Sequence, residues 1–273
     1  MRRGTAKRFG FFSMLVLATT AFGSVGGASV SQAGSTMSES HAPRIPIPGP
    51  GGIHATTADD PWLSRNWSGY AIDSGTYTSV TGSWTVPTVI APQHPGRARQ
   101  FSSTWVGIDG FNNGDLIQAG TEQDWLHGTP FYQSWWEILP NDETPIDTIT
   151  VNPGDVMTVS LTQGAPDWTI TVTDTTNGQT FSTTEKYSGP MTSAEWIQEA
   201  PTVNGRIATL ADDGTVEFDN ATANGVSPGF TSSDSGVMVK RRGRHVISIP
   251  SAPNPAGNAF AVAFGSVPPL PPD

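Results

Sequence analysis

Most of the chain from Trp67 onward consists of short runs in which β-branched or apolar residues alternate with polar ones. A period of two is typical of strands with one buried face, and there is little of the three-to-four-residue spacing of helices. The runs that predict strands are residues 77–86, 148–151, 156–161, 168–173, 206–210, 237–240, 245–249 and 259–264. Asn177-Gly178 predicts a hairpin turn over residues 173–180. Short strands at this spacing predict an all-β fold, an antiparallel β-sandwich.

Cysteine is absent from the chain. This excludes disulfide bonds, thiol catalysis and thiolate metal sites, so that stability has to come from a hydrophobic core. Residues 61–273 carry all nine tryptophans and are numerous enough to build such a core. We expect them to form a single domain.

The first 33 residues have the pattern of a secretory signal peptide. Arg2, Arg3, Lys7 and Arg8 precede an apolar run over residues 9–18, which is too short for a stable membrane span. Ser31-Gln-Ala33 offers a small-x-small cleavage site, and Gly26-Gly-Ala28 a second one. We therefore expect a secreted, extracellular protein that is not anchored in a membrane after export.

Residues 34–60 are rich in Ser, Gly, Pro and His. This composition cannot supply a core, and it predicts either a disordered spacer or a pro-segment that is removed on maturation. Removal by the protein itself would produce a new N-terminus between Pro61 and Asn66. The C-terminal stretch 265–273, rich in Pro, predicts a tail beyond the last strand.

The predicted exported chain is acidic. Removing residues 1–33 takes away four bases and no acids, which leaves 24 acids against 10 bases and changes the net charge from −10 to −14. Such a charge disfavours nucleic acid or an anionic membrane as a partner, and the cluster 240–244 is read as a solvated strand end. The five histidines have no metal-ligand spacing, so no metal and no cofactor is expected, and His41 falls in the predicted spacer.

Six short motifs then occur in a fixed order. They are Asn66-Trp-Ser-Gly-Tyr-Ala71, Gly82-Ser-Trp-Thr-Val-Pro87, Trp105-Val-Gly-Ile-Asp-Gly110, Ile117-Gln-Ala-Gly120, Trp135-Trp-Glu137 and Ala194-Glu-Trp-Ile-Gln-Glu199. In these motifs the chain resembles the glutamic peptidases, or eqolisins, and specifically a secreted bacterial member. The resemblance implies a sandwich of two large antiparallel sheets, polypeptide substrates, an acid endopeptidase activity insensitive to pepstatin, and a catalytic Gln/Glu dyad.

Carried over by motif, the dyad falls on Gln118 and Glu199. Alternation would place Glu195, Ile197 and Glu199 on one face of a strand, so the pattern alone does not choose between the two acids. The resemblance favours Glu199, and Glu195 is the alternative. A carboxylate can take a proton from water and return it to the leaving amine, while an amide N–H can stabilise the oxyanion. This chemistry needs no metal and suits an acidic medium.

Four further residues are predicted to support the dyad or bind substrate, again through the resemblance. They are Trp105, Asp109, Trp135 and Glu137. The two carboxyls are expected to hydrogen-bond Gln118 or the substrate backbone, and the two indoles to form walls of the cleft. Trp84, Trp168 and Trp196 are instead predicted to lie in the core.

Two other classes fit parts of the same pattern. A glycoside hydrolase on a concanavalin-like sandwich would use paired acids such as Glu137 and Glu199 with tryptophan platforms, but would not need Gln118. A non-catalytic module could bind peptide or carbohydrate in an acidic, Trp-rich groove. In all three cases a monomer is expected.

Overall fold

The computed structural model describes Met1 and residues 38–47, 61–164, 167–240 and 245–273. The predicted signal peptide, apart from Met1, and residues 48–60 of the predicted spacer lie outside this set. Among the described residues no helix has the length and apolarity needed to cross a membrane.

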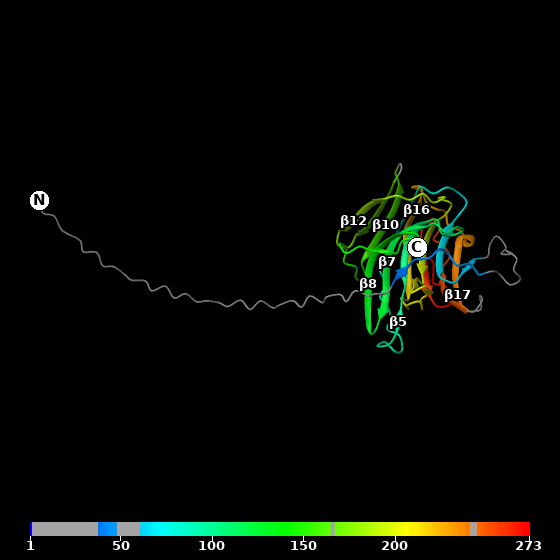
Figure 1. The fold of residues 1–273 in the computed structure, drawn as a ribbon, viewed down its shortest axis with the longest axis horizontal. Helices are drawn as coiled ribbons and strands as arrows, with labels where there is room; N and C mark the ends of the chain where they lie inside the picture. Colours follow the sequence, from blue (N-terminus) through cyan, green and yellow to red (C-terminus); the bar gives the residue numbers. More distant parts are fainter. Residues whose placement is uncertain (2–37, 48–60, 165–166, 241–244) are drawn as a thin grey trace. The chain divides into compact units, whose positions relative to one another are not determined.

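The regular secondary structure of the described chain is all β-strand apart from one 3₁₀ turn at Ser232–Asp234 (Figure 1). The strands of the first half are β1 (Glu39–Ser40), β2 (Trp62–Ser64), β3 (Trp67–Ile72), β4 (Ser79–Thr85), β5 (Arg99–Gln100), β6 (Ser103–Ile108), β7 (Ile117–Leu126), β8 (Thr129–Ile138) and β9 (Thr144–Pro145). Those of the second half are β10 (Val156–Gln163), β11 (Trp168–Asp174), β12 (Gln179–Glu185), β13 (Ala194–Glu199), β14 (Thr202–Val203), β15 (Arg206–Ile207), β16 (Thr215–Ala223), β17 (Ser235–Lys240), β18 (His245–Pro250) and β19 (Phe260–Phe264). The predicted all-β class is confirmed.

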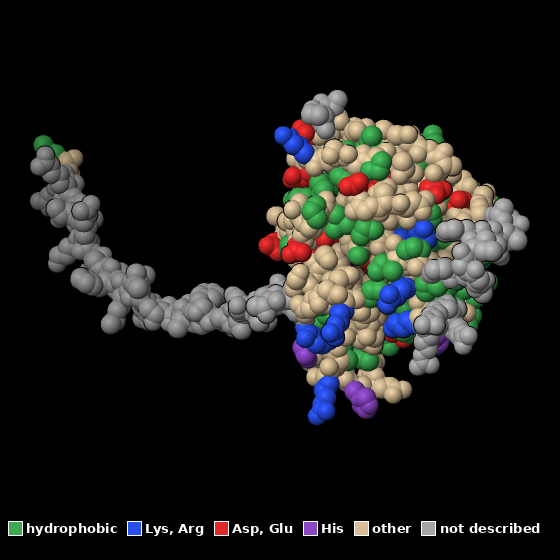
Figure 2. Space-filling view, turned by 45° about the vertical axis from the view of Figure 1, so that its right-hand side comes forward, with side chains coloured by type: hydrophobic (Ala, Val, Ile, Leu, Met, Phe, Trp, Pro, Cys, Tyr) green, Lys and Arg blue, Asp and Glu red, His purple; other side chains and the backbone are tan. Residues whose placement is uncertain are grey.

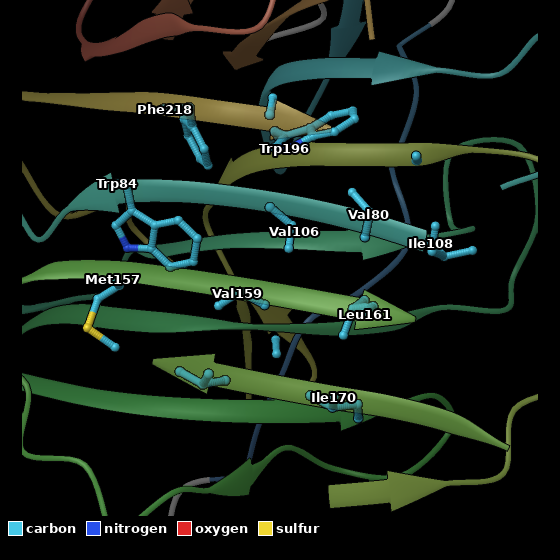
Figure 3. Close-up of a cluster of buried hydrophobic side chains, with 14 of the residues drawn as sticks. Val80, Trp84, Val106, Ile108, Met157, Val159, Leu161, Ile170, Trp196 and Phe218 are labelled. Atoms are coloured by element: carbon cyan, nitrogen blue, oxygen red, sulfur yellow. The ribbon is translucent and has the colours of Figure 1, made fainter. Parts of the chain in front are cut away.

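Hydrogen bonding links the strands in the order β12-β11-β10-β4-β16-β19-β18-β17-β3-β13-β6-β7-β8-β9, and the pairs along this order are antiparallel. The two halves of the order pack face to face as a sandwich. Val80 and Trp84 of β4 belong to the same buried cluster as Val106 and Ile108 of β6 and Trp196 of β13 (Figure 3). Burial of apolar surface between the layers, at roughly 25 cal/mol per Å², stabilises the fold without any disulfide.

Several local predictions can be compared with these strands. The hairpin over residues 173–180 is confirmed by the pairing of β11 with β12, and Gly178 has the positive φ, 77°, that such a turn requires. The strand predicted over 148–151 is wrong, because Ile149 and Val151 are buried in the core from a turn that has no strand partner. Of the run 206–210, only Arg206–Ile207 is a strand.

The layer formed by β3, β13, β6, β7 and β8 is buried on both faces. On its inner face lie core residues such as Ile117, Ala119 and Trp196, while Trp67, Trp105 and Trp135 form a second apolar cluster on its outer face. Polar side chains alternate with this core, so they point to the outer face as well. That face carries the predicted site residues of β6, β7, β8 and β13.

Residues 38–47 lie against this outer face (blue in Figure 1). Glu39 and Ser40 form β1, which pairs with β14 in a separate small sheet with β15, and Ile47 donates a hydrogen bond to the carbonyl of Leu63. The composition of the segment predicts that it has no core of its own. It does not reveal that backbone hydrogen bonds and a cleft in the sandwich hold it in place.

Candidate active site

Strand pairing sets the positions of the predicted dyad. In the register, Gln118 of β7 lies opposite Glu137 of β8, and Trp105 of β6 lies between Ile197 of β13 and Gly120 of β7. Gly120 leaves room for the indole, since a Cβ built there would lie 2.6 Å from the Trp105 Cβ. Glycine at this position therefore lets β6 and β7 pair closely beside Trp105, whose indole N–H reaches Glu199.

Gln118 is fully buried, and its amide nitrogen makes two hydrogen bonds. Gln118 Nε2 donates to Glu137 Oε2 at 2.6 Å and to the carbonyl oxygen of His41 at 3.1 Å. Both partners are acceptors, which fixes the orientation of the carboxamide with its NH₂ toward them. The hydrogen bond from Gln118 to Glu137 is one of the contacts that the sequence predicts. It holds the amide so that its other N–H points at the backbone carbonyl of His41.

Glu199 is also fully buried, and donors surround its carboxylate. Trp105 Nε1 donates to Oε2 at 3.0 Å, while Asn66 Nδ2 and the Ala42 N–H donate to Oε1 at 3.3 and 3.2 Å. Burial raises the pKa of Glu199, although His41, Asn66 and Trp105 stabilise the charged form and oppose this. The carboxylate thus keeps a charge-stabilising shell together with a pKa above the ordinary value.

Glu137 has a different environment. Burial raises its pKa to about 8, His41 opposes the rise, and the charges of Glu199 and Glu143 add to it. In an acidic medium Glu137 is therefore protonated and neutral. The neutral acid orients Gln118 without adding a second negative charge next to Glu199.

His41 lies at the candidate site, although the sequence interpretation placed it in the predicted spacer. Its side chain is completely buried and stacks on Trp135, with ring centroids 3.7 Å apart and planes 8° from parallel. Nε2 lies 3.0 Å from Glu143 Oε2, and Nδ1 lies 3.4 Å from Glu199 Oε2. Burial of the ring favours the neutral form, but contacts with Glu143 and Glu199 outweigh it and raise the pKa of His41 well above its usual value.

A group of buried acids surrounds His41. Burial, together with the charges of neighbouring acids, raises the pKa of Glu39 to about 8 and those of Glu122 and Asp124 well above the ordinary range. Burial acts on Glu143 in the same direction, but its contacts with His41 and Glu122 leave the pKa of Glu143 lowered. Exposed acids, in contrast, are spread among other side chains on the face shown in Figure 2.

Two sets of these side chains have the donor atoms to hold a cation. They are His41, Glu122 and Glu143, and Glu39, Glu122 and Asp124, each with ligand atoms within 4.8 Å of one another. Close buried carboxyls are equally able to share protons, which is the arrangement that their raised pKa values favour. The sequence shows only that Glu122 and Asp124 lie close together on β7, and it does not show that His41 lies near them.

The remaining predicted residues divide between two places. Trp105 and Trp135 lie at the site, where Trp105 binds Glu199 and Trp135 carries His41. The Asp109 carboxylate instead accepts hydrogen bonds from the Tyr187 hydroxyl at 2.6 Å and from the backbone of Met191 at 2.8 Å. None of its hydrogen bonds reaches Gln118, so a role for Asp109 in orienting the dyad stays a prediction.

Glu195 shares the strand and the face of Glu199 but has no comparable partners. Within the described structure, neither of its carboxylate oxygens makes a hydrogen bond. Burial raises its pKa well above the ordinary value, the nearby Ser193 hydroxyl opposes the rise, and the charge of Asp109 adds to it. The geometry therefore favours Glu199 over Glu195 as the acid that meets a peptide.

Comparison with known proteins gives the family of the chain. Residues 65–249 match the model of the peptidase A4 family. Aspergillopepsin-2 of Aspergillus niger is 30% identical over 209 residues, which cover 68% of this chain and 73% of that protein.

Solved structures show the same fold. Scytalido-glutamic peptidase with a transition state analog inhibitor aligns with a TM-score of 0.61 at 20% identity, covering 73% of this chain and 98% of that one. Aspergilloglutamic peptidase from Aspergillus niger aligns with a TM-score of 0.52 at 29% identity, covering 60% and 99%. These relatives confirm the predicted β-sandwich of large antiparallel sheets.

The family match spans more than half of the chain and includes the strands that carry Gln118, Glu137 and Glu199. The two solved structures are glutamic peptidases by name. The chain therefore belongs to the peptidase A4 family and is a glutamic peptidase.

Proposed function

We propose that this peptidase is a secreted acid endopeptidase in which Glu199 acts as general base and acid and Gln118 stabilises the oxyanion. One observation carries the proposal. Gln118 and Glu199 contact opposite ends of the same peptide group, the amide to the His41 carbonyl oxygen and the carboxylate to the Ala42 N–H. A dyad that hydrolyses an amide needs this division between its oxygen and its nitrogen.

The reaction follows from the two side chains. Glu199 takes a proton from a water molecule as the water oxygen attacks the carbonyl carbon, and the Gln118 N–H holds the developing oxyanion. Glu199 then returns the proton to the departing amine. Glu137 keeps the Gln118 amide aimed through its 2.6 Å contact.

The proposed pH range follows from the environments of the acids. Glu199 must be ionised to act as a base, and burial raises its pKa above 4.5. The rate should therefore fall below this raised value. Because Glu137, with a pKa of about 8, is neutral in acid and becomes charged in alkali, a second negative charge near Glu199 should lower the rate again at high pH.

The test is the release of peptides from an acid-denatured protein across pH 3 to 9, with pepstatin or a chelator added in parallel. We expect activity in acid that neither reagent changes. Glu199→Gln keeps the size of the side chain and its ability to accept from Trp105 but removes the base, so it should lower kcat/KM by roughly a thousandfold or more.

The exposed Glu217, on β16, provides a matched control, since Glu217→Gln makes the same chemical change at a surface position that contacts neither Gln118 nor Glu199 by any hydrogen bond of the described structure. This variant should keep full activity. Folded protein with no acid proteolysis at any pH, or a Glu199→Gln variant as active as the control, would show the proposed mechanism to be wrong.

A further inference from the structure

The segment in the cleft lies as a substrate would lie. Its His41 carbonyl oxygen accepts from the oxyanion donor Gln118 at 3.1 Å, and its Ala42 nitrogen lies 3.2 Å from the general acid Glu199. The peptide bond between His41 and Ala42 therefore has each end opposite the group that would act on it.

Contacts on both sides hold this bond in place. Upstream, Glu39–Ser40 pairs with Thr202–Val203, and the His41 N–H donates to Glu137 Oε2 at 3.1 Å. Downstream, the Ala42 carbonyl accepts from Trp67 Nε1 at 3.0 Å and from Asn66 Nδ2 at 3.3 Å. The chain is fixed before and after the bond by groups other than the dyad.

Farther downstream the segment remains attached. The Arg44 N–H donates to the Gly110 carbonyl at 3.0 Å, and its guanidinium lies 4.1 Å from the centre of the Phe111 ring. The Ile45 N–H donates to Asn66 Oδ1 at 2.9 Å. An external peptide cannot enter while these contacts are made, because the segment occupies both sides of the dyad.

We propose that residues 38–47 are an internal substrate that blocks the cleft and that the peptidase cuts its own chain between His41 and Ala42. This inference rests on the proposed function and adds the bond and the substrate class. The bond lies upstream of the Pro61–Asn66 region at which the sequence predicts a mature N-terminus.

The step balances without any further reactant. One water oxygen forms a bond to the His41 carbonyl carbon while Glu199 takes a proton from that water, and the carbonyl electron pair moves to the oxygen held by Gln118. The C–N bond then breaks, and the Ala42 nitrogen takes the proton from Glu199. One water is consumed, His41 gains a carboxyl group and Ala42 gains an amino group.

The pocket around His41 defines the class of substrate. Trp135 offers a flat surface to a ring, and Glu143 and Glu199 face the two ring nitrogens, so the pocket favours a cationic aromatic side chain. Ala42 places only a methyl group on the other side of the bond. Peptides with His before a small residue are therefore the preferred substrates.

The experiment uses the full chain. Protein purified at neutral pH is moved to pH 4, and samples are analysed over time by intact mass and N-terminal sequencing while hydrolysis of an added denatured protein is followed. We expect a product that begins Ala42-Pro43-Arg44. Its rate of formation should be independent of protein concentration, because the bond already lies in the cleft.

Variants of the segment test the assignment without altering the sandwich. Ala42→Pro removes the N–H that faces Glu199 and should abolish this cut. His41→Asp places a negative charge among acids and should slow it at least about tenfold, while His41→Phe keeps the stacking and should slow it less. The exposed His94, in a distant loop, provides His94→Ala as a control that should process normally.

The results of this experiment separate the inference about the His41–Ala42 bond from the proposed function. Acid hydrolysis of the added protein with the His41–Ala42 bond intact, or with a first cut elsewhere, would overturn the inference and leave the proposed function standing. A cut at this bond that continues unchanged in Glu199→Gln would show that another protease makes it. If the folded protein shows no self-cleavage and no hydrolysis of the added protein, the proposed function itself is contradicted.

Discussion

Glu195 and Glu199 lie on the same face of β13, four residues apart, and both are fully buried. At the Glu199 end the carboxylate accepts from Trp105, Asn66 and the Ala42 backbone. At the Glu195 end neither oxygen has a hydrogen-bond partner in the described structure. The difference shows that strand alternation only selects the face, and that donors arriving from other elements decide which buried acid can carry a charge.

The largest expected effect concerns the donor opposite Glu199. Gln118→Ala removes the amide that faces the peptide carbonyl and should lower kcat by roughly a hundredfold to a thousandfold, about 3 to 4 kcal/mol of barrier. The exposed Gln93→Ala is the control, and equal kcat values for both variants would remove Gln118 from the mechanism.

The second prediction concerns stability and pH. The folded-state pKa values of Glu39 and Glu137, about 8, lie above the unfolded value of about 4.5, so the folded state binds these protons more tightly. Their contribution to the free energy of unfolding is therefore fully present below pH 4.5. It is lost progressively as the pH rises from 4.5 to about 8. The raised pKa of His41 acts in the same direction, since its contribution is complete below its ordinary value and is lost as the pH rises through the folded value.

Denaturant unfolding of a Glu199→Gln chain, which cannot process itself, should therefore show a stability maximum in mild acid. At about 1.4 kcal/mol for each unit of pKa, the loss between pH 5 and pH 9 should be up to about 4 kcal/mol for each of the two acids Glu39 and Glu137. Glu143, whose pKa is lowered, should cause a decline below pH 4.5. A profile that rises steadily from pH 5 to pH 9 would contradict these assignments.

The third prediction addresses the other end of β13. Glu195→Met replaces an unpartnered buried carboxyl by an apolar side chain of similar size and should raise the free energy of unfolding at pH 8 by about 1 to 3 kcal/mol. The gain should be smaller at pH 4, where Glu195 is neutral in the folded state and mostly neutral in the unfolded state. Activity should change little, and a loss comparable to that of Glu199→Gln would instead make Glu195 the catalytic acid.

The smallest effect is expected from one donor of Glu199. Trp105→Phe removes the N–H on Oε2, so the pKa of Glu199 should rise further and the acid limb of kcat/KM should move upward by roughly one pH unit. Trp168→Phe is a matched control, because that buried indole nitrogen has no hydrogen-bond partner among the described residues. An acid limb that moves equally in both variants would rule out a specific role for the Trp105 bond.

Much of this arrangement could be predicted from the sequence, because the sandwich depends on local alternation. Trp84, Trp168 and Trp196 are core residues as predicted, since strand periodicity determines which face they occupy. The contact of Gln118 with Glu137 was also predicted, but from family resemblance, because the register of β7 and β8 is not readable from either strand alone.

The errors have a common physical origin. The segment around His41 has a composition that cannot fold alone, and its order comes from a cleft built by residues far along the chain, such as Glu137 and Glu199. Likewise, Ile149 and Val151 satisfy the strand pattern but are buried from a turn, since packing alone can bury an apolar side chain. The docking of the segment around His41 and the burial of Ile149 and Val151 both depend on residues far along the chain. Such contacts leave no periodic signal in the sequence.

The two carbonyls downstream of the His41–Ala42 bond have a practical consequence. Asn66 Nδ2 lies 3.3 Å from the Ala42 oxygen and 3.2 Å from the Pro43 oxygen, and the indole of Trp67 also binds the former. The stretch Ser40–Pro43 can therefore serve as the template for a synthetic inhibitor. A short synthetic mimic that keeps the imidazole and both carbonyls, with a tetrahedral alcohol in place of the scissile amide, would match the pattern of donors that the cleft already presents.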